Sequence, residues 1–391
     1  MTAGTGLAAA DELALREYVR NWIGEHLTPE FFPAALARLD TDERVEVRRR
    51  WERELLDGEL LASSWPVEHG GQGLEPWQEV VIEEELGLAG APDLINLIGF
   101  RLAGPVLLDV GRDEQKEHFL PRILSGDDIW CQGFSEPGAG SDLASLQASA
   151  VDHGDHYVVN GQKVWTSWAM HAQKCLLLAR TDRDVPKHQG ITAFAVDMDT
   201  PGIDVRPVRQ ITGESEFCEV FFDGVAVPRD RIIGVPGQGW EIARLTLLYE
   251  RGSNFVYLAG VERTFRGLVA RLRARPEPPA GDVITRLVAA QVELAALQAT
   301  ARSYLDRLTA GTADPTEASL IKLGWTELDV AIKDLALEVA GTAAVVRAPG
   351  AEPSAELHEM LASRAETIYG GTSEIQRNLI AERLLGLPKG G

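Results

Sequence analysis

The sequence predicts an α+β protein with three domains. An N-terminal α-helical domain is expected at residues 1–127, a central antiparallel β domain at 128–236 and a C-terminal four-helix-bundle domain at 237–391. Three observations support this division: apolar residues recur at helical spacing in the first part, alternate with polar residues in the middle, and return to helical spacing after Gly239. A chain of 391 residues is long enough for two or three domains that share substantial cores.

Apolar side chains near the N-terminus repeat every three or four residues. The repeat comprises Leu13, Leu15, Tyr18, Val19, Trp22 and Ile23. This spacing is typical of one face of a helix, and helical patterning continues to about residue 127. The segment Trp65-Pro-Val-Glu-His-Gly-Gly-Gln-Gly73 interrupts it, and its Gly and Pro content predicts a loop.

From Ile129 to about Val235 the pattern favours short antiparallel strands. His153-Gly-Asp155 and Asn160-Gly161 are turn signals. The runs expected to be strands are Tyr157–Val159, Val164–Thr166, Cys175–Leu178, Ile191–Val196 and Glu219–Phe222. Helical segments do not alternate with these runs, as a parallel sheet would require.

Helical spacing then continues to Leu385. Helical segments are expected near residues 240–272, 282–309, 315–340 and 354–385. The Pro-rich segment Arg273-Ala-Arg-Pro-Glu-Pro-Pro-Ala-Gly281 predicts the clearest break between two of them.

The charge balance is strongly acidic, because 38 Lys and Arg against 59 Asp and Glu give a net charge of −21. An acidic surface repels nucleic acid and anionic membranes, so neither is expected as the main partner. The chain starts without a signal-peptide pattern, and no apolar stretch reaches membrane-spanning length. Its three distant cysteines argue against a disulfide framework or a zinc site. We therefore expect a cytoplasmic protein with no metal site and no membrane span.

Three strings combine small residues with hydroxyl or indole groups, as binding of a flat, phosphate-bearing cofactor requires. They are Trp130-Cys-Gln-Gly-Phe-Ser-Glu-Pro-Gly-Ala-Gly-Ser-Asp-Leu143, Val164-Trp-Thr-Ser167 and Ile368-Tyr-Gly-Gly-Thr-Ser-Glu-Ile-Gln-Arg377. Glycines let a backbone approach a pyrophosphate closely, and the consecutive amides of Gly138-Ala-Gly-Ser141 can bind an anion. This string lacks the third glycine of a dinucleotide-binding fingerprint. Taken alone, it is compatible with an ordinary glycine-rich turn.

In their order and spacing, the three strings resemble the acyl-CoA dehydrogenase family, from about Asp11 to about Leu385. The resemblance implies the family's α–β–α fold, FAD as cofactor, an acyl-CoA substrate and an electron-transfer flavoprotein as electron acceptor. The implied reaction is α,β-dehydrogenation of the thioester to the trans-2-enoyl-CoA. We therefore expect an oxidoreductase of fatty acid or steroid catabolism.

The resemblance also assigns roles to residues. Phe134 and Ser135 would present donors to the flavin pyrimidine edge, and Ser141 would lie beside the phosphates and the pantetheine path. Trp165 would cover one face of the isoalloxazine, and Ser167 would donate to N5. The residues expected to bind the cofactor are Gln132, Phe134, Ser135, Gly140, Ser141, Trp165, Thr166, Ser167, Thr372, Ser373 and Glu374.

Residue type alone leaves simpler roles open for three of these positions. Trp165 is also compatible with a core aromatic on a strand, and Ser167 with a strand-end hydroxyl that is satisfied locally. Thr372 is a good helix N-cap, and it can serve both roles because a helix N-terminus attracts phosphate.

Removal of the substrate α-proton requires a carboxylate opposite the flavin face. Many family members carry it in the Ile-Tyr-X-Gly-Thr string, where this chain has Gly370. A second branch, which includes the long-chain and isovaleryl enzymes, places it just before an arginine of the C-terminal bundle, and Glu250-Arg251 matches. Apolar neighbours would raise the pKa of Glu250 toward neutrality, which suits a base. The alternative is an exposed glutamate among 59 acids.

The resemblance gives four residues a part in substrate binding. The Gly370 N–H would polarise the thioester carbonyl together with a ribityl hydroxyl of FAD, which needs only a backbone. Arg251 would steady the CoA end, unless it merely pairs with an acid, and Gly371 and Ser141 would contact the substrate. The missing side chain at 370 leaves room for a bulky acyl group.

Two strings depart from the family's pattern. Homotetrameric members carry Arg-X-X-Phe-Gly, which reaches the FAD adenosine of a neighbouring subunit, but this chain has Leu272-Arg-Ala-Arg-Pro-Glu-Pro-Pro-Ala280. A second adenine-side string, roughly Gln-Ile-Leu-Gly-Gly in relatives, reads Glu338-Val-Ala-Gly-Thr342. Either the chain has diverged and still binds FAD as a homotetramer, or a paralogous subunit supplies these contacts, as in some bacterial steroid-type enzymes.

Two other functions are compatible with the same strings. One is an oxygen-using flavin oxidase or hydroxylase on the same fold, and the other is a non-catalytic subunit of a mixed complex. Glu250 and the intact ring-side strings favour the dehydrogenase over the second of these. The sequence does not specify the acyl chain.

Overall fold

The computed structural model describes residues 7–250, 252, 254–276, 278–346 and 353–389. They form two compact units, each built from separated segments of the chain. The helical unit lies within residues 1–40, 74–92 and 251–391, and the sheet unit within residues 41–73 and 93–250. Among the helices described, none is long and apolar enough to cross a membrane.

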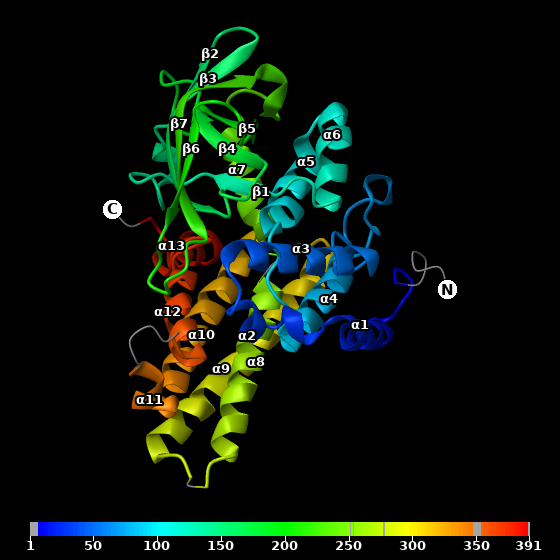
Figure 1. The fold of residues 1–391 in the computed structure, drawn as a ribbon, viewed down its shortest axis with the longest axis vertical. Helices are drawn as coiled ribbons and strands as arrows, with labels where there is room; N and C mark the ends of the chain where they lie inside the picture. The colour runs from blue at the N-terminus through cyan, green and yellow to red at the C-terminus, as the bar shows by residue number, and fades with distance from the viewer. Residues whose placement is uncertain (1–6, 251, 253, 277, 347–352, 390–391) are drawn as a thin grey trace. The chain divides into compact units, whose positions relative to one another are not determined.

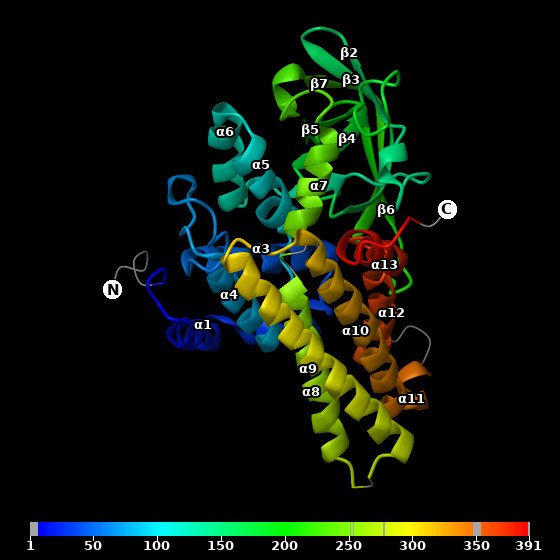
Figure 2. The ribbon, with the colours of Figure 1, turned by 180° about the vertical axis from the view of Figure 1, so that it is seen from behind.

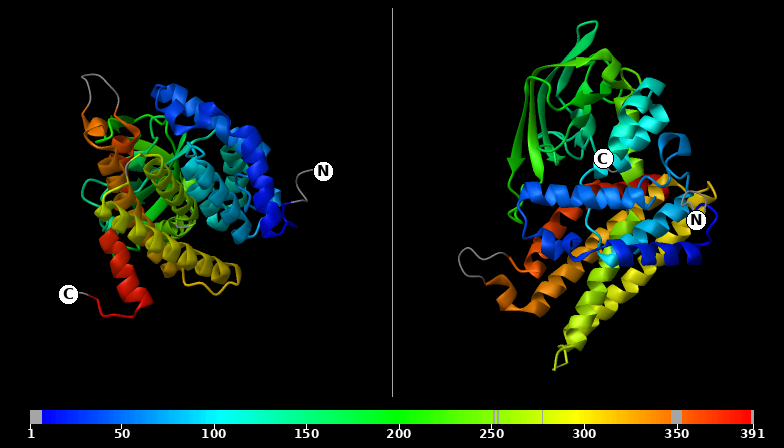
Figure 3. Two further views of the ribbon diagram at one scale, coloured as in Figure 1. Left: turned by 90° about the horizontal axis from the view of Figure 1, so that it is seen from below. Right: turned by 45° about the vertical axis from the view of Figure 1, so that its right-hand side comes forward.

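The helical unit joins two N-terminal segments to the C-terminal bundle. Its helices are α1 (Glu12–His26), α2 (Pro33–Leu36), α4 (Pro76–Ala89), α8 (Asn254–Arg273), α9 (Gly281–Thr309), α10 (Ala318–Ala340), α11 (Thr342–Val345), α12 (Ala355–Glu366) and α13 (Ser373–Leu379). Helix α10 packs against α8, α9 and α12, and α4 packs against α8 (Figures 1 and 2). Helices α8 and α9 run antiparallel as a hairpin, coloured yellow-green and yellow in Figure 3.

Helix α1 shows how the sequence sets a helix of this unit. It begins after Asp11, whose carboxylate accepts the Ala14 N–H at 2.9 Å and so caps the first turn. The buried side chains are Leu15, Val19, Trp22 and Ile23. Leu13 and Tyr18, which the sequence placed in the same repeat, are 76% and 37% exposed and lie off that face.

The sheet unit is built on one eight-stranded sheet. Its strands are β1 (Trp130–Gly133), β2 (Ser149–Asp152), β3 (His156–Ser167), β4 (Lys174–Arg180), β5 (Ile191–Asp197), β6 (Ile203–Val208), β7 (Phe217–Pro228) and β8 (Ile232–Ile233). The strand order is β6-β7-β3-β2-β4-β5-β8, and β1 also pairs with β4. Strands β4 and β5 are buried along nearly their whole length, and their sequences are therefore continuous apolar runs.

Strands β1 and β2 follow the same edge of β4 in succession. Residues 130–133 of β1 pair with residues 174–177, and Ser149 of β2 pairs with Arg180, both in parallel. The chain between them, residues 134–148, therefore leaves the sheet and returns to the same edge. This loop, which we call the edge loop, carries the predicted phosphate-binding string.

The sheet unit also contains helices. They are α3 (Thr41–Asp57), the π-helical turn η4 (Gly99–Ala103), α5 (Gly104–Val110), α6 (Asp113–Leu124) and α7 (Gly239–Glu250). Helix α7 contacts β4, β5, η4 and α5. Its first residue lies so close to β5 that a Cβ at Gly239 would come within 2.7 Å of the Ile191 carbonyl carbon.

The predicted fold class is confirmed, with three differences in detail. The parallel pairing of β1 and β2 with β4 was not expected, because it arises from an excursion along one edge rather than from crossover helices. Strands β3 and β7 have twelve residues each and are not short. The segment near 240–272 forms two helices, α7 and α8, and α7 belongs to the sheet unit.

Candidate functional site

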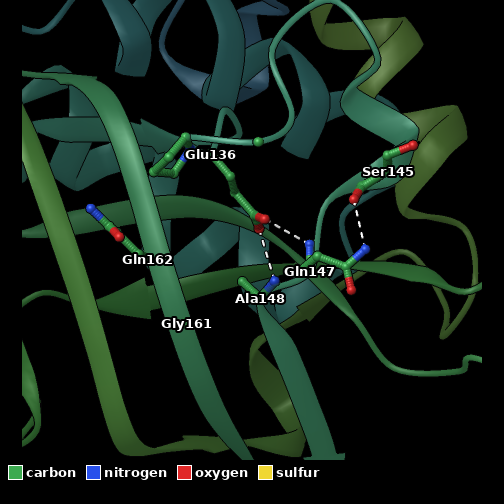
Figure 4. A pocket seen from close by; sticks show the side chains of 8 residues that line it. Glu136, Ser145, Gln147, Ala148, Gly161 and Gln162 are labelled. Atoms are coloured by element: carbon green, nitrogen blue, oxygen red, sulfur yellow. Dashed lines mark hydrogen bonds between the residues drawn. The ribbon is translucent and has the colours of Figure 1, made fainter.

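A buried ion pair fixes the edge loop. The Glu136 carboxylate accepts the N–H groups of Gln147 at 2.6 Å and Ala148 at 2.9 Å (Figure 4). It also accepts the Lys163 ammonium at 2.8 Å, and Lys163 donates to the Phe134 carbonyl at 3.0 Å. The start and end of the loop are thus tied to one point on β3.

This pair is buried, so both charges depend on their partners. The side chain of Lys163 is 0% exposed and that of Glu136 is 8% exposed. Burial lowers the pKa of Lys163, and the Glu136 carboxylate opposes that shift. Neither residue was among the predicted site residues, although Glu136 lies inside the first string.

The glycines of the edge loop are not required by its own packing. A Cβ at Gly138 or Gly140 would meet no atom within 4 Å, and neither residue has a positive φ. In the described part of the chain, the N–H groups of Gly138, Gly140 and Ser141 have no acceptor. Exposed amides without partners suit an anionic ligand, so this segment fits the FAD pyrophosphate.

A cavity of about 510 Å³ lies beside the edge loop (Figure 4). Its lining consists of Glu136, Pro137, Gly138, Ser145, Gln147, Ala148, Gly161 and Gln162. The Glu136 carboxylate already has its partners within the protein, so we assign it to the scaffold rather than to a ligand.

Trp165 occupies an irregularity in β3. The register against β7 shifts between Lys163 and Thr166, and Trp165 has φ +60° in the left-handed region. Its indole is 58% exposed and contacts the Phe217 ring edge-on at 6.1 Å. The bulge therefore turns a large aromatic out of the sheet core, which rules out the alternative of a core aromatic and fits a flat ring stacked on its face.

The neighbours of Trp165 are placed differently from one another. Thr166 is 0% exposed and its Oγ1 has no partner among the described atoms, so its proposed contact with FAD rests on its backbone. Ser167 ends β3 and is half-buried, which leaves its hydroxyl compatible with the proposed bond to N5. Gln132 is half-buried in β1, and Phe134 is buried.

The strained backbone at Trp165 gives a stability prediction. Glycine in a strand is normally less stable than alanine by about 0.5–1 kcal/mol. At φ +60° the order should reverse, so Trp165→Gly is expected to unfold with a free energy about 1 kcal/mol higher than Trp165→Ala. Urea unfolding of the two flavin-free variants measures this. The same pair of changes at Val158 of β3, where φ is not positive, should keep the ordinary order.

The side chain of Asn96 anchors the start of β1. Asn96 is fully buried, and its side chain accepts the Trp130 N–H at 2.8 Å and donates to the Asp128 carbonyl at 3.0 Å. The Asn96 N–H donates to Glu52 of α3 at 2.7 Å, and burial raises the pKa of Glu52 to about 7. These residues were missed because contacts 34 and 44 residues apart leave no local pattern.

The third string forms a tight turn in the helical unit. Gly370 and Gly371 have φ +65° and +97°, where side chains other than hydrogen are strained. The Gln376 amide donates to the Gly370 carbonyl at 2.9 Å, and the buried Lys322 of α10 donates to the Gly371 carbonyl at 2.9 Å. The positive φ at position 370 therefore accounts for a glycine there, independently of the acyl group for which it leaves room.

Helix α13 begins directly after this turn. The Thr372 hydroxyl accepts the Ile375 N–H at 3.2 Å, so Thr372 is the N-cap that residue type allowed. Ser373 is buried, whereas Glu374 is exposed and its pKa is lowered by hydrogen bonds from its own backbone N–H and from Thr372. Capping does not exclude the proposed flavin contacts of these three residues.

Glu250 is the last residue of α7 and is half-buried. The preceding residue, Tyr249, donates its hydroxyl to Asp109 of α5, and burial together with Asp109 raises the pKa of Tyr249. This bond holds the end of α7 within the sheet unit, which also contains Trp165 and Ser167. Arg251 lies outside the described residues.

The two strings that depart from the expected pattern lie side by side. The guanidinium of Arg275, which follows α8, donates to the Val339 carbonyl near the end of α10. Arg286 of α9 pairs with Glu338 at 2.6 Å. Both departures therefore affect one region of the helical unit.

The comparisons with known proteins agree with this architecture. Three family models match in order: the acyl-CoA dehydrogenase N-terminal domain at residues 9–127, the middle domain at 131–225 and the C-terminal domain at 237–385. Together they span the segments that carry all three strings.

One similar protein is "Acyl-CoA dehydrogenase IpdE1" of Mycobacterium tuberculosis, which is 42% identical over 389 residues, covering 96% of this chain and 97% of the relative. Among solved structures, "Tcur3481-Tcur3483 steroid ACAD" has a TM-score of 0.85 at 28% identity, covering 97% of this chain and 98% of that chain. The "ChsE4-ChsE5 complex from Mycobacterium tuberculosis" has a TM-score of 0.82 at 30% identity, with coverage of 97% and 98%.

Proposed function

Because the chain belongs to the acyl-CoA dehydrogenase family, whose members are FAD-binding oxidoreductases, we propose that it oxidises an acyl-CoA thioester to the trans-2-enoyl-CoA. The observation that carries this proposal is Trp165, whose exposed indole stands on a strained bulge beside Ser167. A large aromatic held outside its own core is explained by a flat ligand that stacks on it.

Glu250 is the proposed base for the substrate α-proton. It is half-buried at the end of a helix that the Tyr249–Asp109 bond anchors. A carboxylate at this position can accept the α-proton as a general base. When bound, FAD would supply the N5 atom that accepts the β-hydride. We propose an electron-transfer flavoprotein as the acceptor of the electrons.

The turn at Gly370 is the proposed site for the thioester carbonyl. Negative charge develops on this oxygen as the α-proton leaves, and preorganised N–H donors stabilise it. Among the described residues, the N–H groups of Gly370, Gly371 and Thr372 have no acceptor within the protein. Ser141 would contact the pantetheine path and Arg251 the CoA end.

A steroid-derived acyl-CoA is the substrate class that we propose. The solved structure with a TM-score of 0.85 is titled a steroid enzyme, and Gly370 adds no side chain to the turn. Both structural relatives named above are titled as pairs of proteins, which supports a paralogous partner over a homotetramer. We place the enzyme in the cytoplasm, because its three cysteines are free and buried.

The partner hypothesis predicts that the chain expressed alone is poor in flavin. The missing adenine-side contacts include charge-assisted hydrogen bonds worth about 1.5–3 kcal/mol each. Two such losses weaken binding by roughly a hundredfold or more. Co-expression with a paralogue should give about half a flavin per polypeptide, measured by the ratio of flavin to protein absorbance. Stoichiometric FAD in a homotetramer would contradict the partner hypothesis and leave the dehydrogenase intact.

Anaerobic mixing with acyl-CoA tests the reaction itself. A dehydrogenase and an oxygen-using oxidase should both bleach the bound flavin without oxygen. On admission of air, the dehydrogenase should stay reduced until an electron-transfer flavoprotein is added, whereas the oxidase should recover its colour at once. A flavin that no acyl-CoA bleaches would contradict the proposed function and favour a non-catalytic subunit.

A further inference from the structure

Two side chains hold the carbonyl groups of the Gly370–Gly371 turn. The Lys322 ammonium, on α10, donates to the carbonyls of Glu366 and Gly371, each at 2.9 Å. The Gln376 amide, on α13, donates to the carbonyls of Gly370 at 2.9 Å and Gly371 at 3.3 Å. Both side chains are buried, with 5% and 1% of their surface exposed.

The ammonium of Lys322 joins two parts of the chain. It bridges Glu366, the last residue of α12, to the turn through their main-chain carbonyls. Burying an ammonium costs several kcal/mol unless it is hydrogen-bonded, so these bonds help to keep Lys322 in place. Lys333, on the same helix, contacts Asp329 and Glu366, the latter at 3.1 Å.

Holding these carbonyls determines where the amides of the turn point. In a trans peptide the C=O and the following N–H point in opposite directions. Bonds to the Gly370 and Gly371 carbonyls therefore direct the N–H groups of Gly371 and Thr372 away from Lys322 and Gln376. A side chain at Gly371 would be strained by φ +97°, and its Cβ would displace the Gln376 amide, whose nitrogen lies 2.7 Å away.

We infer that Lys322 is a positioning residue for the acyl-CoA thioester: with Gln376, it fixes the two peptide planes that follow the Gly370 N–H, so that the N–H groups of Gly371 and Thr372 are preorganised, together with that of Gly370, for the substrate carbonyl. This inference rests on the proposed function, because it needs the turn to bind that carbonyl. We assign Lys322 no contact with substrate or cofactor. Its effect is transmitted through the backbone, because Lys322 and Gln376 share the Gly371 carbonyl and Gln376 also holds the Gly370 carbonyl.

The test compares Lys322→Met with Lys333→Met. Methionine keeps the length of the side chain and removes the donors. Lys333→Met removes an ammonium that is 14% exposed from the same helix, and Lys333 bonds to the Glu366 carboxylate rather than to the turn. Infrared spectroscopy of bound acyl-CoA labelled with ¹³C at the carbonyl reports polarisation directly. Probes with short straight, long straight and polycyclic acyl groups cover the unknown chain.

The parent protein should lower the carbonyl stretching frequency of at least one probe on binding. Lys322→Met should lose most of that frequency shift. Its kcat should fall by about tenfold or more with little change in KM, whereas outright removal of an oxyanion donor lowers kcat by roughly 10²–10³. Lys333→Met should keep the shift, even where it lowers the melting temperature. Gln376→Leu should reduce the shift independently, and it replaces Lys322→Met in the comparison where that variant does not fold.

Two results would overturn the inference, and they differ from each other. A full carbonyl shift in both Lys322→Met and Gln376→Leu would refute the positioning role while leaving the proposed function in place. A parent protein that is loaded with FAD, but shifts the band of no probe and keeps its flavin colour with every probe, would refute the proposed function and this inference with it.

Discussion

Replacement of Glu250 by glutamine is expected to lower turnover by about 10²–10⁴, because losing a positioned general base costs that much. Glutamine has nearly the same shape and cannot accept the α-proton. Flavin content should not change, since Glu250 ends α7 and is not part of the edge loop or of the bulge at Trp165. Steady-state kinetics and the visible flavin spectrum measure the two effects separately.

Glu241→Gln is the matched control for this experiment. Glu241 lies in the first turn of the same helix and is exposed, so its loss removes an equal charge without touching the proposed base. It should leave kcat within a factor of about two, in line with the small effects of ordinary surface changes. If Glu250→Gln retained activity within about threefold of the parent, far less than a lost base costs, another group would have to remove the proton.

Lys163→Met is expected to cost about 3–5 kcal/mol of unfolding free energy, because it leaves Glu136 buried without its cation. Flavin should be lost as well, since Lys163 ties the Phe134 end of the edge loop to its Gln147–Ala148 end through Glu136. Urea unfolding of the flavin-free protein and FAD titration measure the two losses.

Lys187→Met serves as the control, because Lys187 lies between β4 and β5 and pairs with Asp142 of the same edge loop. Lys187 pairs with Asp142 at 2.7 Å, but both side chains are about half exposed, at 48% and 61%. An exposed pair contributes about 0–1 kcal/mol, so this variant should remain near the parent in stability. Equal losses in the two variants would show that burial of the Lys163–Glu136 pair is not what stabilises the loop.

The three-part fold was predictable from the sequence, because helical and alternating periodicities are local. The three strings proposed for the site came from the family resemblance, and their roles stay predictions. The bulge in β3 was not predictable in the same way. Strict alternation puts Trp165 on the same face as Lys163, which is buried, yet the register shift before Thr166 turns the indole outward. A shift of one residue in register moves every following side chain to the opposite face of the sheet, and the neighbouring residues carry no sequence signal that predicts it.

The supporting contacts were invisible for a different reason. Lys163 is in phase with the buried Tyr157 and Val159, so its burial could have been suspected from alternation. Its partner Glu136 lies 27 residues earlier, and the partner of Lys322 at Gly371 lies 49 residues later. Pairings over such distances are set by the tertiary fold, which no periodicity in one sequence encodes.

The division of the chain into two units has a consequence for biosynthesis. The sheet unit uses residues 41–73 and 93–250, so all of its parts have been synthesised before α8 is made. Helix α4 packs against α8 and α9, and its Val80 belongs to the same buried cluster as Phe255 of α8. This face of α4 therefore lacks its partners while residues 93–250 are synthesised. A nascent chain whose first 250 residues have emerged would combine a foldable sheet unit with an exposed apolar helix face, which makes it a substrate for chaperones.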